Sequence, residues 1–292
     1  MRFFSIYQSL IDILLINCCI AFSQYVVLRA GVFSLATSGV VSIGAYTGAV
    51  LTMRYGVPAW VGLLAGTALG ALISIILSIP LARLRGAFQA IATISFMQIV
   101  VSVTLYAENI TSGALGIQNI PKLVSTGTLA VVVAGLIWLL SSINASSIGR
   151  AFDAIREDET VAVALGISIV KYHTIAFALS GAIAGLAGAL LAYNTRAIDP
   201  EQFGFGLLVM ALATVVLGGR VSVWGPVVGA ALLTLLPEFI RPLADQRLIV
   251  YGALLMIVII YLPEGIVDTL KARWSRKSAI AQISAGQTRP HA

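Results

Sequence analysis

The feature that most constrains this chain is a series of long intervals without a charged residue. Each is longer than the roughly 20 residues that an α-helix needs to cross a bilayer. They separate Arg29 from Arg54, Arg54 from Arg83, Arg85 from Glu108, Lys122 from Arg150, and Lys171 from Arg196. The sequence therefore predicts an all-α fold, a polytopic helical membrane protein.

The composition of the 292 residues agrees with this fold class. Hydrophobic residues make up 59% and charged residues only 10%, and the mean hydropathy is +0.99. No soluble domain has that balance. Slightly shorter apolar intervals follow Asp12, Glu201, Arg220 and Arg247. About nine spans are expected, near residues 7–28, 35–53, 57–82, 87–106, 126–143, 172–193, 205–218, 225–241 and 247–263.

The net charge of +6 has its explanation in membrane topology. Basic residues of membrane proteins gather in cytoplasmic loops, so nucleic-acid binding is not expected. We expect one membrane domain, residues 1–270, with an aqueous loop at 144–171, and a flexible basic cytoplasmic tail at 271–292. If that loop is inside, alternation of the spans also places Arg29, Arg83, Arg85 and Arg220 inside.

The charges of this loop are too dense to lie in hydrocarbon. Its apolar residues recur at i, i+3, i+4 and i+7, which predicts an amphipathic helix. Asp158 is expected to cap a second short helix, and Gly166 to end it in the left-handed conformation. Two such helices form a protruding knob that another protein can bind. The apolar side comprises Ile148, Ala151, Phe152 and Ile155, and the opposite side Arg150, Asp153, Arg156 and Glu157.

The same loop carries a family resemblance. The strings Gly149-Arg150-Ala151, Ala154-Ile155-Arg156-Glu157 and Ala164-Leu165-Gly166-Ile167, with Lys171-Tyr172, resemble the cytoplasmic coupling loop of branched-chain amino-acid ABC transporter permeases. The resemblance extends from about Leu28 to Asp268. In that family the loop docks into a groove of an ATPase subunit. The alternative is a solvated loop whose helices touch only lipid headgroups. The coupling residues that the resemblance implies are Gly149, Arg150, Phe152, Asp153, Ile155, Arg156, Glu157, Leu165 and Gly166.

The resemblance also implies an assembly. Its other members would be a second permease subunit, giving a heterodimer, two ATPase subunits that hold ATP and magnesium, and a periplasmic substrate-binding protein. The location would be the bacterial inner membrane. No cofactor, metal site or catalytic residue is expected in this chain, since it has no phosphate-binding loop and no constellation of His, Cys or paired carboxylates.

Residues 30–55 hold an unusual density of small and hydroxyl side chains. They fit either a tightly packed helix or a discontinuous helix that lines a translocation path. Ala36 and Thr37 depart from the family pattern, which could alter substrate choice. The pattern is matched at Gly31, Ser34, Leu35, Gly44, Ala45 and Tyr46. Gln98 is either an interhelical hydrogen-bond pin or a path residue. The candidate path residues are Ser34, Thr37, Ser38, Ser42, Thr93 and Gln98.

Two glycine patterns predict close packing. Gly181 and Gly185 predict a tight helix crossing in the sixth span. A Gly-rich turn between two late spans resembles a family hinge. An echo of residues 70–83 in residues 229–241 favours an inverted repeat. The hinge residues are Gly218, Gly219, Gly225 and Pro226.

These features predict alternating access driven by a partner. Buried ionisable residues are scarce, with Asp12 and Glu238 as the main candidates, so proton or sodium coupling is disfavoured. Cys18 and Cys19 are interpreted as small apolar residues. The expected solute is a branched-chain or other apolar amino acid. Urea or short amides, and less favourably a passive channel, are the alternatives.

Overall fold

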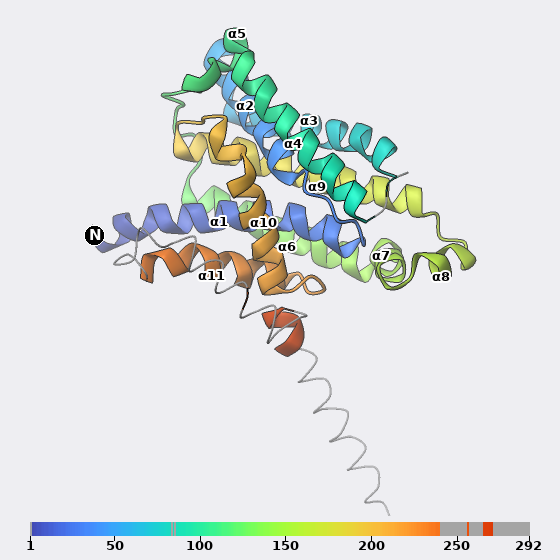
Figure 1. Ribbon diagram of the computed structural model, residues 1–292. Helices are drawn as coiled ribbons and strands as arrows, with labels where there is room; N and C mark the ends of the chain where they lie inside the picture. Colours follow the sequence, from blue (N-terminus) through green and yellow to red (C-terminus); the bar gives the residue numbers. More distant parts are fainter. Residues whose placement is uncertain (1, 83, 85, 240–255, 257–264, 271–292) are drawn as a thin grey trace, which may run out of the picture.

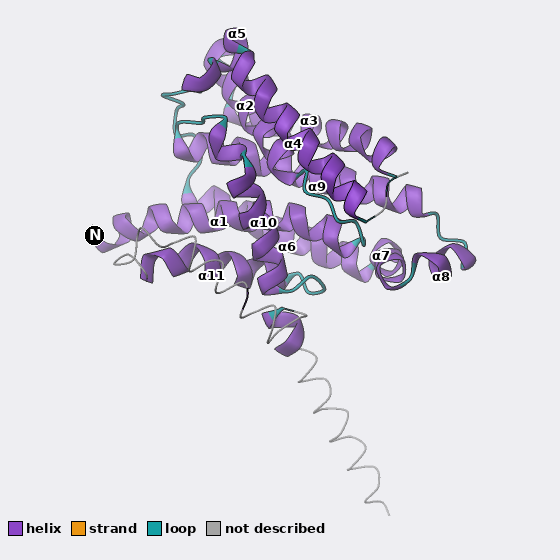
Figure 2. Ribbon diagram, in the orientation of Figure 1, coloured by secondary structure: helices purple, strands orange, loops and turns teal. Residues whose placement is uncertain are grey.

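The computed structural model describes residues 2–82, 84, 86–239, 256 and 265–270, and this part is built from helices (Figure 2). Apart from one isolated bridge between Ile117 and Ile198, the described residues form no β-structure. The longer helices are α1 (Arg2–Arg29), α2 (Thr37–Tyr55), α3 (Ala59–Leu81), α4 (Ala87–Tyr106), α6 (Thr126–Ala145), α9 (Ile169–Thr195), α10 (Phe205–Gly218) and α11 (Trp224–Phe239). The shorter ones are α5 (Glu108–Thr111), α7 (Ser147–Glu157), α8 (Glu159–Ala164), η1 (Gly113–Leu115) and η2 (Glu201–Phe203).

Each of the first eight predicted spans corresponds to one of the longer helices. Within the described residues, six helices are long and apolar enough to cross a membrane: α1, α3, α4, α6, α9 and α10 with the η2 turn before it. The apolar part of α11 is shorter, and α2 is rich in Gly, Ser and Thr. The ninth predicted span, 247–263, and the tail, 271–292, lie outside the described residues.

Helix α9 lies at the centre of the bundle, against α1, α2 and α3 (Figure 1). Glycines set the closeness of these contacts: a Cβ on Gly185 would collide with the backbone of Gly66, and one on Gly188 with the backbone of Val41. Small residues allow such approach between helices in a membrane. The predicted tight crossing at Gly181 and Gly185 is therefore confirmed.

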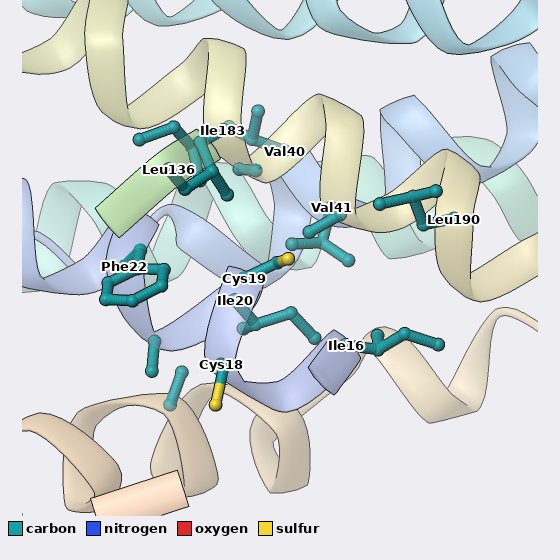
Figure 3. Packing of buried hydrophobic residues seen from close by; sticks show 14 of the residues in the cluster. Ile16, Cys18, Cys19, Ile20, Phe22, Val40, Val41, Leu136, Ile183 and Leu190 are labelled. Carbon is teal, nitrogen blue, oxygen red and sulfur yellow. The ribbon is translucent and has the colours of Figure 1, made fainter. Parts of the chain in front are cut away.

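The apolar core gathers around α1 (Figure 3). Cys18 and Cys19 are free and buried there, with their side chains among aliphatic neighbours such as Ile20 and Val41. They serve as small apolar side chains, as predicted. In contrast, only 22% to 28% of α3, α4 and α6 is buried inside the chain, against 67% of α1 and α9. Three long helices thus present broad apolar faces outward.

The discontinuity expected near residues 30–55 falls at the start of that segment. Residues 30–36 are not helical, and Gly31 has a positive φ of 81°, whereas α2 is a single unbroken helix. Gln24 of α1 holds this stretch: its Nε2 donates to the carbonyl of Ser34 (2.8 Å), and its Oε1 accepts from the Thr37 hydroxyl (2.5 Å). The packed-helix interpretation applies to α2, and the interruption lies just before it.

The helices alternate in direction as predicted. The end of α1 meets α7 and the turn between α10 and α11, since Arg29 contacts both Asp153 and Val221. We call this the charged end of the bundle. At the opposite end Arg54 donates to the carbonyl of Asn109, and Ile117 pairs with Ile198. Arg83 and Arg85 lie outside the described residues. The inverted repeat stays a prediction.

Candidate functional site

Helix α7 forms the larger half of the knob and is anchored by its apolar side. Ser146 caps it by accepting from the Ile148 amide at 3.2 Å. Phe152 and Ile155 are each 2% exposed, and the Phe152 ring meets Tyr172 of α9 edge-on at 6.4 Å. Burying such side chains supplies the free energy that holds a short helix in place, because a helix of this length is not stable alone.

Close packing against the end of α6 requires a glycine at position 149. A Cβ there would overlap the carbonyls of Ile143 and Asn144, at the end of α6. The chain therefore turns directly from α6 into α7 without room for a side chain.

Helix α8 is held far more loosely. The Asp158 carboxylate accepts from the amides of Thr160 (2.7 Å) and Val161 (3.2 Å), and Gly166 follows with φ of 81°. These backbone hydrogen bonds hold the pKa of Asp158 below its usual value. The predicted cap and stop are both confirmed. Of the six residues of α8 only Ala162 is buried, while Leu165 just beyond it is 72% exposed.

The structure corrects one part of the predicted pattern. Asp153 and Arg156 were expected to face water beside Arg150, but they turn back toward α1. Asp153 accepts from Nη2 of Arg29 at 3.0 Å, and Arg156 lies 3.4 Å from the same carboxylate. The reason is tertiary: the buried Arg29 guanidinium offers Asp153 an opposite charge, which the helical periodicity of the loop alone cannot show. Arg150 and Glu157 remain exposed.

Arg29 also links the knob to the Gly-rich turn. Its Nη1 donates to the Tyr25 hydroxyl and to the carbonyl of Val221, both at 2.7 Å. Tyr25 donates to the same carbonyl at 2.9 Å and accepts from Asn144 at 3.0 Å. A continuous hydrogen-bonded chain thus runs from α7 through the end of α1 to the turn. The sequence prediction missed Tyr25 and Asn144, because the bonds from Tyr25 to Val221 and from Asn144 to Tyr25 join residues more than 100 positions apart.

The turn itself is tightly packed. Gly218 and Gly225 approach so closely that a Cβ on either would overlap backbone of the facing glycines, and Gly219 has φ of 121°. Pro226 is the third residue of α11, where a missing amide proton costs nothing. The Asp268 carboxylate accepts from the amides of Val221 (2.8 Å) and Ser222 (3.0 Å). The sequence prediction missed Asp268.

The candidate path residues of α2 lie inside the bundle. Ser38 and Ser42 are fully buried, and their hydroxyls have no hydrogen-bond partner within the part of the chain that the structure describes. The hydroxyl of Tyr46, which was not among the candidate path residues, is also buried without a hydrogen-bond partner among the described residues. The three residues are spaced at i, i+4 and i+8, so they share one face of α2. This spacing is visible in the sequence and could have identified Tyr46.

The other path candidates are divided between packing and exposure. Ser34 and Thr37 are bound to Gln24, and the Thr93 hydroxyl accepts from the Leu35 amide at 3.0 Å. These three residues fix the stretch before α2 in place. Gln98, in contrast, is exposed on the outward side of α4. Either of its predicted roles would therefore involve a group outside this chain.

Known proteins similar to this chain are transport permeases. Residues 9–260 match the family model described as branched-chain amino acid transport system / permease component. The chain is 30% identical over 288 residues to the high-affinity branched-chain amino acid transport system permease protein LivM of Salmonella typhimurium, covering 87% of this chain and 68% of the relative. LivM of Escherichia coli K12 matches to the same extent.

A more distant relative carries a different solute in its name. The guanosine ABC transporter permease protein NupQ of Bacillus subtilis is 26% identical over 235 residues, covering 70% of this chain and 71% of the relative. No solved structure matches the chain.

Proposed function

We propose a mechanism from the premise that this chain belongs to the family of branched-chain amino acid transport system permease components. It is the permease subunit of an ABC importer and a multi-pass protein of the inner membrane. Partners that hydrolyse ATP and deliver solute follow from that membership. The finer proposals concern the coupling residues, the path, the solute and the second permease subunit.

The knob formed by α7 and α8 is the proposed docking site for the ATPase. The single observation that carries this is its division into an anchored inner side, with Phe152 and Ile155, and an exposed outer side, with Arg150, Glu157 and Leu165. A coupling element needs both sides: the exposed side binds the ATPase, and the buried side passes the movement on to the helix bundle. A passive channel would need no such structure.

Force would pass from α7 along two routes. Phe152 presses on Tyr172 at the start of α9, the central helix, while Asp153 is tied through Arg29 to the turn between α10 and α11. ATP binding by the partner would favour one arrangement of these elements, since a partner shifts an equilibrium only through its different affinity for the two states. Gly218, Gly219 and Gly225 would then act as the pivot.

The hydroxyl face of α2 is the proposed translocation path. Leaving buried hydroxyls unpaired costs free energy, about 1–3 kcal/mol for each group. The hydroxyls of Ser38, Ser42 and Tyr46 are buried without a partner among the described residues, and a passing polar solute would supply one. Tyr46 lies against Phe203, with ring centroids 6.1 Å apart, near the outer end of this face.

The proposed solute is a branched-chain or other apolar amino acid. The two LivM relatives, which match 87% of this chain at 30% identity, carry that solute in their names, and the guanosine permease carries another. A zwitterion has no net charge, so its route through the bundle needs few charged side chains. The α2 face offers hydroxyl groups instead. The outward faces of α4 and α6 are available to a second, different permease subunit, which gives the proposed heterodimer.

Uptake by the reconstituted transporter tests the proposal. Proteoliposomes containing both permeases and the ATPase, supplied with the binding protein, should accumulate labelled leucine only with ATP, and valine and isoleucine should compete whereas urea and acetamide should not. Ser42→Ala should change the uptake rate. Ser9→Ala is the matched control, because Ser9 lies exposed near the start of α1 and outside the hydroxyl face of α2. Uptake without ATP would contradict the importer mechanism, and equal rates for both variants would contradict the path.

A further inference from the structure

Two outward-facing helices with the same exposure differ in the chemistry of their faces. In both α3 and α4, only 28% of the membrane-spanning part is buried inside the chain. The outward face of α3 is apolar, with Leu64, Leu72 and Ile76 between 52% and 61% exposed. Its two serines, Ser74 and Ser78, are buried on the other side. This arrangement suits contact with lipid, because hydrocarbon offers no hydrogen bonds.

The outward face of α4 carries polar groups instead. Ser95, Gln98 and Ser102 are all exposed, and their spacing at i, i+3 and i+7 places them on one side of the helix. We call these three residues the polar stripe of α4. Helix α4 has 20 residues, and Gln98 stands near its middle. A helix of that length is about 30 Å long, so its middle lies at the depth where the bilayer consists of hydrocarbon.

The polar stripe is only partly satisfied within the described part of the chain. Ser95 donates to the carbonyl of Ile91, one turn earlier in its own helix, at 3.0 Å. The side chains of Gln98 and Ser102 form no hydrogen bond with any other described residue. A carboxamide that faces hydrocarbon without a partner costs free energy, because lipid tails can neither donate nor accept a hydrogen bond. The stripe therefore indicates that another polypeptide segment covers this part of α4.

The predicted ninth span of the chain, residues 247–263, has the wrong composition to be that segment. Its central residues 248–260 read LIVYGALLMIVII, in which Tyr251 is the single side chain with a hydroxyl or amide group. The stripe extends over about two helical turns, so a covering helix has to offer several donors and acceptors. The chemistry of the stripe thus favours a helix that belongs to another subunit in the membrane.

We propose that the polar stripe of α4 is the contact surface for the second permease subunit, with the carboxamide of Gln98 hydrogen-bonded to polar side chains of that subunit. A carboxamide can both donate and accept, and side-chain hydrogen bonds of this kind join helices within membranes. The small side chains of Ser95 and Ser102 let the partner helix approach closely. This inference rests on the heterodimer proposed above. It makes Gln98 an interhelical pin between two chains and leaves the apolar face of α3 to lipid.

Energy transfer between the two permeases tests the proposal. Each full-length permease carries a fluorescent tag at its C-terminus, and both are reconstituted in liposomes at increasing lipid-to-protein ratio, which gives their dissociation constant. Ser102→Trp should raise that constant about tenfold or more, because a bulky ring on the stripe holds the two helices apart. Leu72→Trp is the matched control on the exposed face of α3 and should leave the constant unchanged.

A second variant tests the hydrogen bonds themselves. Gln98→Leu should raise the dissociation constant about threefold to tenfold by removing the interhelical hydrogen bonds. A face in contact with lipid would behave in the opposite way, since leucine suits hydrocarbon better than a carboxamide does.

Three results would overturn the proposal. The first is an unchanged dissociation constant in either stripe variant; ATP-driven uptake by the unaltered transporter would then still support the function proposed above. The second is energy transfer between two copies of this chain with none to the other permease, which would replace the proposed partner with a second copy. The third is no energy transfer between the unaltered permeases, which would contradict the heterodimer as well.

Discussion

Helices α7 and α8 are adjacent and short, yet the rest of the molecule holds them very differently. Helix α7 buries Ala151, Phe152 and Ile155 and is tied to Arg29, while α8 buries only Ala162 and depends on the Asp158 cap. A partner that pulled on α8 alone could unwind it. A partner that moved α7 would move α1 and α9 as well. In the proposed mechanism, transmission therefore belongs to the buried side of α7, and recognition to the exposed residues of α7 and α8 and to Leu165.

Phe152→Ala should produce the largest effect. Removing a buried aromatic side chain typically costs about 3–5 kcal/mol, and here the loss would free α7 from Tyr172. We expect ATP hydrolysis to continue while leucine uptake falls about tenfold or more. Val161→Ala on exposed α8 is the control and should change stability by less than about 0.5 kcal/mol. Equal uptake by the two variants would show that α7 and α8 do not differ in transmission.

Arg29→Met should have the next largest effect. It leaves Asp153 with Arg156 alone and removes the hydrogen bonds from Arg29 to the Val221 carbonyl of the Gly-rich turn and to the Tyr25 hydroxyl. Because Asp153 is about one-third exposed, the loss should lie below the 3–5 kcal/mol of a fully buried pair, at about 1–3 kcal/mol. Thermal unfolding of Arg29→Met, Asp153→Asn and the double variant measures the coupling. Strictly additive losses would mean that α7 is not held through this pair.

Leu165→Asp should separate recognition from stability. At 72% exposure the change should alter the stability of the permease by less than about 0.5 kcal/mol. Affinity for the ATPase subunit should nevertheless fall about tenfold, or 1.4 kcal/mol. Leu115→Asp is the matched control, since Leu115 is 82% exposed at the opposite end. Unchanged ATPase affinity in surface plasmon resonance would remove Leu165 from the docking surface.

Asp158→Ala should have the smallest effect, confined to fraying of α8. Amide protection at Thr160 and Val161 should fall, and Asp158→Ser should restore it because serine also caps helices. The folded-state pKa of Asp158 is lowered by those two amides, so the stabilisation is present above the ordinary carboxylate pKa and is lost as pH falls through the lowered value. Protection that is constant down to strongly acidic pH would contradict the cap.

Short-range patterns in the sequence were enough to predict the first eight spans, the two helices of the knob and the family. Local periodicity placed the spans, and Asp158 and Gly166 marked the ends of α8, because caps and amphipathic faces depend on neighbours a few residues away. Glycine spacing even indicated the tight crossing at Gly181 and Gly185. These features depend on residues that are close together in the sequence, so they can be recognised from the sequence alone.

Only the tertiary structure decided which polar groups meet. Asp153 turned inward because Arg29, 124 residues earlier, is buried beside it, and Asp268 binds the turn across 47 residues. Tyr46 joined Ser38 and Ser42 because their hydroxyls are buried on one face of α2, with no hydrogen-bond partner among the residues that the structure describes. The physical reason is that hydrogen bonds and ion pairs in a helix bundle are set by which faces pack together, and periodicity gives a helix its faces but does not choose their partners.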